Sequence, residues 1–283
     1  MRSFPTRFAL VFSALAVCSV PAAAQTPPAA VKYRTEKEIP YRTGDGLTDA
    51  MRERCRLDVY YPLETKDAPV VVWFHGGGLQ AGSKAIPPAL TNKGLVVVAA
   101  NYRLSPAAKA PEYVEDAAAA VAWAFANAEK YGGSRKLVFV SGHSAGGYLA
   151  NLVVLDKRWL KAHQVDADDV AGLVPFSGQA VTHYTVRAER GIEKTRPVID
   201  ELAPIYHVRK DAPPILIISG DRNKELLGRY EETAYFWRML KEVGHKQADL
   251  LELQGYDHGG MAEPGFPLLV KFVREHAKPA AGK

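Results

Sequence analysis

Ser144 lies at the centre of the pentapeptide Gly142-His143-Ser144-Ala145-Gly146, which follows the apolar run at residues 137–140. Glycines on both sides of a serine allow a strand to turn sharply into a helix, because no Cβ atoms collide across the turn. Such a turn exposes the serine Oγ and aims helix N–H groups at developing negative charge. The spacing therefore predicts that Ser144 is the nucleophile of an acyl-transfer reaction and that the Ala145 N–H binds the oxyanion.

The Gly-rich sequence His75-Gly76-Gly77-Gly78 directly follows another apolar run, at residues 70–74. Consecutive glycines let the main chain approach a substrate oxygen without obstruction by side chains. We expect the N–H groups of Gly77 and Gly78 to complete the oxyanion hole, and His75 to shape the loop. A phosphate-binding loop is the alternative, but neither a lysine with Walker spacing nor a G-x-G-x-x-G pattern follows.

His258 is the predicted general base. It lies in the glycine-containing loop 255–261, after a strand-like apolar run at 249–253. A catalytic histidine must reach the serine from a loop, and the glycines at 259 and 260 leave room for that approach. His143, inside the pentapeptide, is expected to pack against the site or polarise it.

The acid that orients His258 is expected just after the apolar run at residues 215–218. Asp221 is the first carboxylate beyond that run and is the predicted acid, because it can accept the imidazole Nδ1–H. Glu225 is the alternative, and an orienting role for Asn223 stays open because Cys-His-Asn sites exist. Asp221 can also be a turn residue without a catalytic role, since Asp is common in turns.

The chain resembles carboxylesterases of the α/β-hydrolase fold, in particular the hormone-sensitive-lipase-like and the feruloyl/acetyl-xylan esterase-like groups. The matching segments are residues 57–62, 75–78 with 82–84, 101–104, 142–147, and His258-Gly259. The order Ser144, acid, His258 is also that of α/β-hydrolases. Two departures concern substrate preference and the acid: Leu79 stands where a tryptophan often follows the glycines, and Asn223 stands where many of these enzymes have the acid.

The resemblance implies a serine hydrolase that cleaves small or medium acyl esters through an acyl-enzyme intermediate. Two alternatives stay open: an amidase or formamidase with the same triad, and a non-catalytic binding protein on the same fold. The intact serine, histidine and glycines argue against the binding protein, because binding alone needs none of them.

Short apolar runs alternate with longer stretches of helical period, which predicts a mostly parallel sheet with helices on both faces. We expect strands at residues 70–74, 95–99, 137–140, 173–176, 215–218 and 249–253, with helices around 114–125 and 266–273. Residues 178–209 are expected to form a short cap. Tyr184, Phe176 and Leu79 are the candidates for the substrate pocket.

The first residues have the pattern of a secretory signal peptide. Arg2 and Arg7 precede an apolar stretch at 8–20, and alanines at 22–24 offer a cleavage site. We therefore expect a signal peptide at 1–24, a disordered linker at 25–30, a hydrolase domain at 31–278, and a periplasmic or secreted protein. Lipidation at Cys18 stays an alternative, whereas the apolar stretch is too short to span a membrane.

The 283 residues, 47% hydrophobic and 24% charged, fit one globular domain. Removal of residues 1–24 lowers the formal charge from +5 to +3 and leaves Cys55, an expected core residue, as the only thiol. Basic residues are scattered among acids, so no nucleic-acid partner is expected. No cluster of Cys, His and carboxylate shows metal-ligand spacing, so we expect neither a metal nor an organic cofactor.

Overall fold

The structure is a computed structural model that describes residues 31–226 and 228–277. The predicted signal peptide, linker and lipidation site lie outside the described residues. The strands are β1 (Tyr33–Pro40), β2 (Arg56–Pro62), β3 (Ala68–Phe74), β4 (Val96–Ala100), β5 (Gly133–His143), β6 (Gly172–Phe176), β7 (Ile215–Gly220) and β8 (Ala248–Leu253). The α-helices are α1 (Asp49–Arg54), α2 (Glu112–Asn127), α3 (Ala145–Leu155), α4 (Arg158–Lys161), α5 (Tyr184–Glu189), α6 (Arg229–Glu242) and α7 (Ala262–His276). Short 3₁₀ turns are η1 (Pro88–Leu90), η2 (Glu129–Tyr131), η3 (Ala167–Asp169) and η4 (Pro204–His207).

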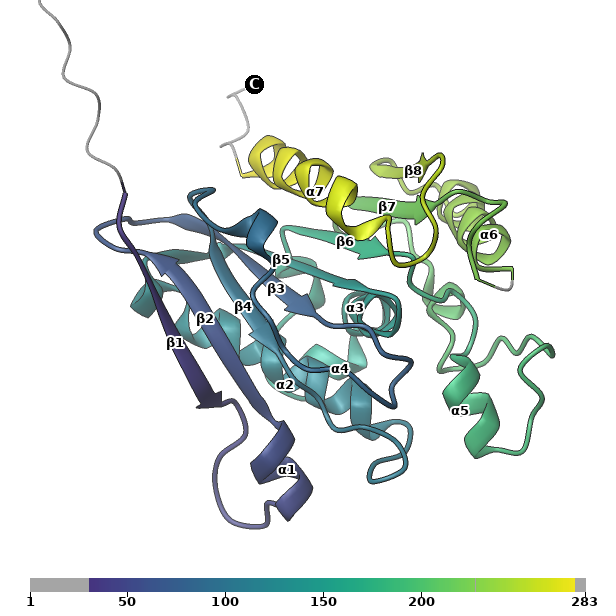
Figure 1. The fold of residues 1–283 in the computed structure, drawn as a ribbon, viewed down its shortest axis with the longest axis horizontal. Coiled ribbons are helices and arrows are strands. Elements are labelled where there is room, and N and C mark those ends of the chain that lie inside the picture. Colours follow the sequence, from purple (N-terminus) through teal and green to yellow (C-terminus); the bar gives the residue numbers. More distant parts are fainter. Residues whose placement is uncertain (1–30, 227, 278–283) are drawn as a thin grey trace, which may run out of the picture. The chain divides into compact units, whose positions relative to one another are not determined.

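The strands form one sheet in the order β1-β2-β4-β3-β5-β6-β7-β8 (Figure 1). β1 pairs with β2, and β2 with β4, in antiparallel register, whereas all other neighbours are parallel. The six strands predicted from the sequence correspond to β3 to β8, and the predicted helices to α2 and α7. The prediction of a mostly parallel sheet in an α/β fold is confirmed.

Hydrophobic side chains cover both faces of the sheet, which explains why its central strands are continuous apolar runs. In β5, Val138 and Val140 point into the core shared with α2, α3 and α6, whereas Phe139 points into the core on the α7 side. This alternation is the period of two that a β-strand imposes. Cys55 is 1% exposed and lies in the core shared with α2, α3 and α6, as expected for a structural thiol.

Parallel strands all end at the same edge of a sheet, and the loops at that edge contain the predicted functional residues. The Gly-rich loop follows β3, Ser144 follows β5, and the loops after β7 and β8 contain the candidate acids and His258. The expected cap segment, residues 178–209, contains α5 and η4, and α5 stands apart from the sheet in Figure 1.

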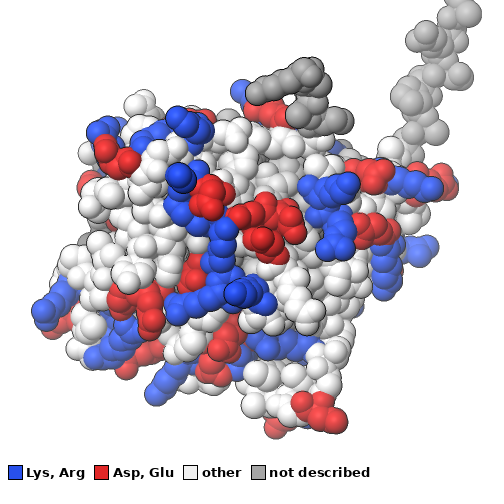
Figure 2. All heavy atoms as spheres, turned by 180° about the vertical axis from the view of Figure 1, so that it is seen from behind, with Lys and Arg blue, Asp and Glu red and all other residues white. Residues whose placement is uncertain are grey.

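Charged side chains of both signs are interspersed on the face shown in Figure 2. Across residues 31–226 and 228–277, no helix combines the length and the hydropathy needed to cross a membrane.

Candidate active site

Ser144, His258 and Glu225 form a continuous row of hydrogen bonds. His258 Nε2 lies 2.8 Å from Ser144 Oγ, and His258 Nδ1 lies 2.8 Å from Glu225 Oε2. These distances are within hydrogen-bond range, so the imidazole can accept the serine proton while the carboxylate holds its other nitrogen. The structure therefore brings together the predicted nucleophile and the predicted base, which are more than a hundred residues apart in sequence.

Ser144 occupies a strained turn between β5 and α3. Its backbone has φ 56° and ψ −116°, which is uncommon for a residue with a side chain, and its N–H donates to the Phe176 carbonyl at 2.8 Å. The backbone after Ser144 passes so close to the end of β3 that a Cβ on Gly146 would lie 2.1 Å from the Phe74 carbonyl oxygen. The flanking glycine thus allows the turn that presents Ser144.

The prediction that Asp221 orients His258 is wrong. Its carboxylate accepts the N–H of Asn223 at 2.8 Å and the N–H of Gly255 at 2.8 Å, and it thereby closes the turn after β7. Asp221 is the first residue of an Asx-type turn, which is the turn role given as an alternative for it from the sequence. Glu225, the alternative, reaches His258 because this turn brings the chain back across the end of β7.

Glu225 is a buried carboxylate with several donors. Its side chain is 1% exposed, and besides His258 it accepts the Ser177 hydroxyl and the N–H groups of Gly220 at 3.0 Å and Leu226 at 3.1 Å. Burial by itself would raise its pKa, but the hydrogen bonds from His258 and Ser177 and the charge on His258 lower the pKa to about 2. Glu225 is therefore ionised at neutral pH and can stabilise an imidazolium. No sequence signal identified Ser177 as its partner.

His143 fixes the position of the His258 backbone. Its Nε2 lies 2.7 Å from the His258 carbonyl oxygen, and the two imidazole centroids are 4.8 Å apart. Burial and the neighbouring His258 lower the His143 pKa to about 4, so the ring is neutral at pH 7 and donates its Nε2–H. His143 thus supports the predicted base, as its place in the pentapeptide suggested.

The Gly-rich loop lies directly against the serine. A Cβ on Gly76 would lie 3.3 Å from the Ser144 Cβ, and Gly77 and Gly78 have φ angles of 114° and 63° that favour glycine. The N–H groups of Gly77, Gly78 and Ala145 donate to no protein acceptor within residues 31–226 and 228–277. They are therefore available for an oxyanion. The Gly78 carbonyl accepts the Thr185 hydroxyl of α5 at 2.5 Å, which ties the loop to the cap segment.

His75 shapes this loop from behind. Its Nδ1 lies 2.6 Å from the Gly76 carbonyl oxygen, and its ring stacks on Tyr102 at 4.4 Å between centroids. The Tyr102 hydroxyl in turn donates to the His75 carbonyl at 2.8 Å. His75 is 8% exposed, and this burial lowers its pKa from 6.5 to about 4.

The depressed pKa of His75 predicts a loss of stability in acid. Between pH 6.5 and pH 4 the unfolded chain binds a proton at His75 that the folded protein does not, so its contribution is complete above pH 6.5 and disappears as the pH falls. Between about pH 7 and pH 4.5, the parent should lose roughly 2 kcal/mol more unfolding free energy than His75→Asn. Urea unfolding at both pH values measures this difference, and equal losses in the two proteins would contradict it.

Of the three candidates for the substrate pocket, Tyr184 lines a cavity, whereas the other two are buried in the core. Leu79 and Phe176 are both 0% exposed, and Phe176 packs against Trp73 and Phe266. The prediction that these two side chains line the substrate pocket is therefore wrong. Tyr184 lies against the Gly-rich loop, since a Cβ on Gly78 would be 2.1 Å from its hydroxyl. It lines a cavity of about 290 Å³, called here the cap cavity, whose wall also contains Gln80, Gln179, Arg187, Lys194, Leu226 and Arg229.

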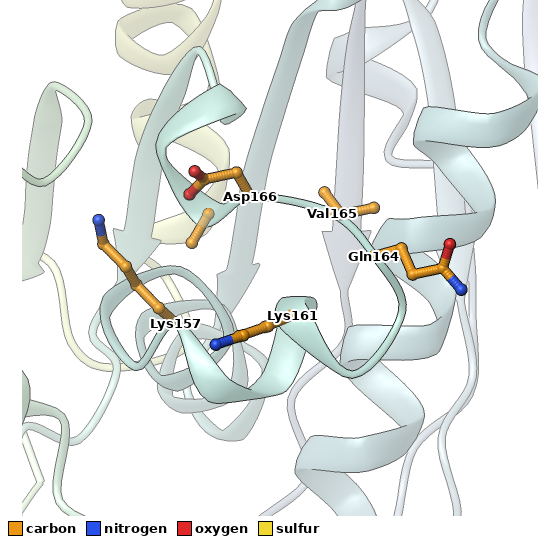
Figure 3. A pocket seen from close by; sticks show the side chains of 6 residues that line it. Lys157, Lys161, Gln164, Val165 and Asp166 are labelled. Atoms are coloured by element: carbon orange, nitrogen blue, oxygen red, sulfur yellow. The ribbon is translucent and has the colours of Figure 1, made fainter.

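A second cavity, of about 380 Å³, lies beside α4 and is lined by Lys157, Lys161 and Asp166, among others (Figure 3). It is near the C-terminal end of α3, whereas Ser144 caps the N-terminal end, roughly 16 Å away along this helix. Lys157 is already paired with Asp168 and Asp211. This cavity is therefore separate from the hydrogen-bonded row.

Comparisons with known proteins agree with this geometry. The BD-FAE family model matches residues 57–233. The esterase LipC of Mycobacterium tuberculosis is 30% identical, in a match that covers 84% of this chain and 64% of LipC. The probable carboxylic ester hydrolase LipM of the same organism is 28% identical, with 69% of this chain and 50% of LipM covered.

The chain therefore spans between half and two thirds of the length of these curated relatives. Among solved structures, a truncated carbohydrate esterase from gut microbiota superimposes with a TM-score of 0.71 at 19% identity, covering 89% of this chain and 98% of the other. This likeness shows a shared fold.

Proposed function

Because the chain belongs to the BD-FAE family of the α/β-hydrolase fold, we propose that it is a serine carboxylesterase. The observation that supports this proposal most strongly is the row Ser144, His258 and Glu225, with both hydrogen bonds at 2.8 Å. The Gly-rich loop lies against the serine, and the N–H groups of Gly77 and Gly78 have no acceptor among the described residues. A nucleophile, a base, an orienting acid and oxyanion donors are the groups that acyl transfer needs.

In the proposed mechanism, Ser144 Oγ attacks the ester carbonyl while His258 Nε2 takes its proton. The N–H groups of Gly77, Gly78 and Ala145 stabilise the oxyanion of the tetrahedral intermediate. His258 then protonates the leaving alcohol, which leaves an acyl-enzyme, and the same base activates the water that releases the acid. Glu225 keeps Nδ1 protonated and stabilises the imidazolium in both steps.

We propose small and medium acyl esters as substrates, because the cap cavity beside the site has a volume of only about 290 Å³. The direct test is hydrolysis of 4-nitrophenyl esters of increasing acyl length, followed by labelling with a fluorophosphonate and mass spectrometry of the modified peptide. We expect turnover that falls for long acyl chains and a single adduct on Ser144. Hydrolysis of 4-nitroanilides in preference to the esters would favour the amidase alternative. A folded protein without turnover or adduct would contradict catalysis altogether.

A further inference from the structure

The cap cavity lies beside the hydrogen-bonded row. Gln80 follows the Gly-rich loop, Leu226 follows Glu225, and Tyr184 contacts Gly78. Arg229 also belongs to its wall and donates to the Ser177 carbonyl, while the Ser177 hydroxyl donates to Glu225. A substrate whose ester bond faces Ser144 can therefore extend a group into this cavity.

Arg187 of α5 is an unusual wall residue because it is buried without an acidic partner. It is 5% exposed, it donates through Nη1 to the Arg196 carbonyl, and its buried Nε has no hydrogen-bond acceptor among the described residues. A buried guanidinium without an acidic partner is costly unless another negative charge lies near it. Among the described residues, no carboxylate forms an ion pair with the Arg187 guanidinium.

The other charges of the wall leave this positive potential uncompensated. Arg229 is neutralised by Glu232, whose carboxylate lies 3.0 Å from its Nε and also accepts the Ala180 and Val181 N–H groups. Lys194 forms no ion pair within residues 31–226 and 228–277. The wall therefore presents two unpaired cations, Arg187 and Lys194, and amide donors from Gln80 and Gln179.

We propose that the cap cavity binds a carboxylate of the ester substrate, so that the enzyme prefers esters that carry a negative charge. This inference rests on the proposed esterase function and assigns Arg187 and Lys194 as specificity-determining residues. A planar carboxylate matches the fork of donors on a guanidinium, and a partly dry site strengthens the attraction. Tyr184 and Leu226 supply the apolar surface for the short chain that joins the carboxylate to the ester.

Two pairs of esters test the proposal, one for each side of the scissile bond. The mono(4-nitrophenyl) ester of glutaric acid is compared with its terminal amide, and 4-acetoxybenzoate with 4-acetoxybenzamide. Within each pair the two esters have nearly the same shape and differ in charge, and the uncatalysed rate of each ester is subtracted. For at least one pair, kcat/KM of the parent protein should be about tenfold or more higher for the anion, because hydrogen bonds to ionised groups are the strong ones. That preference should decrease at high salt.

Arg187→Gln should lower the anion-to-neutral ratio about tenfold, and Lys194→Gln should lower it less because Lys194 is exposed. The ratio is independent of how much of each variant is folded. Arg135→Gln is the matched control, because Arg135 is exposed at the start of β5, the opposite end from Ser144. If Arg187→Gln does not fold, Lys194→Gln and the salt dependence decide.

Parent ratios near one, with good hydrolysis of the neutral esters, would overturn the carboxylate site and leave the esterase function intact. A high parent ratio that neither cavity variant changes would also overturn it. No hydrolysis of any of the four esters by folded protein would instead contradict the proposed function, and with it the inference.

Discussion

Ser144→Ala is expected to lower kcat for ester hydrolysis about 10⁶-fold, because no other group can form the acyl-enzyme. His258 and Glu225 would remain paired in the variant, but the imidazole at 2.8 Å from Oγ would have no hydroxyl to deprotonate. The oxyanion donors do not depend on Oγ, so a residual rate above that in water should persist. Steady-state rates with a 4-nitrophenyl ester, after subtraction of the uncatalysed reaction, measure the loss.

Ser134→Ala is the control for this substitution, since Ser134 lies near the start of the same strand, β5. It should retain parent activity. Thermal unfolding of both variants separates a catalytic loss from misfolding, because the Ser144 hydroxyl bonds only to His258 within residues 31–226 and 228–277. Retention of more than about 1% of the parent kcat by folded Ser144→Ala would contradict a nucleophilic role.

The central sheet could be predicted because its strands are buried on both faces and therefore read as apolar runs. The first two strands were not predicted as strands. β1 has the sequence YRTEKEIP and is mostly exposed, so no hydrophobic period marks it. Its pairing with β2 depends on backbone hydrogen bonds, which need no particular side chain, and edge strands commonly have charged residues of this kind.

The site was predictable where a motif restricts the backbone. Gly142, Gly146 and Gly77 are required by close approaches of main chain to main chain, and those approaches leave a sequence pattern. Pocket residues leave no such pattern. Leu79 and Phe176 were candidates because they neighbour the motifs in sequence, but their side chains point into the core.

The acid illustrates the same limit. Asp221 and Glu225 are both carboxylates after β7, and only the path of the intervening turn decides which one reaches His258. That path depends on the Asp221 side chain itself, which bonds to the Asn223 and Gly255 N–H groups. A short Asp after a strand is well suited to close a turn, whereas the longer Glu225 side chain can reach the histidine.

Glu225→Gln is therefore expected to lower kcat about 10⁴-fold with little change in KM. The amide keeps the shape of the carboxylate but loses its charge, so it cannot stabilise the imidazolium and can hold the ring in the wrong tautomer. The Glu225 pKa of about 2 means that the parent carries this charge throughout the range in which the enzyme can be assayed.

Asp221→Asn is the matched control, because it makes the same chemical change four residues earlier. Asn keeps an oxygen that can accept one of the turn N–H groups, so we expect kcat within about threefold of the parent and at most a modest loss of stability. Parallel kcat measurements on the two variants decide between the acids. A larger loss of kcat in Asp221→Asn than in Glu225→Gln would mean that Asp221 approaches His258 during turnover and that the row built on Glu225 is not the catalytic one.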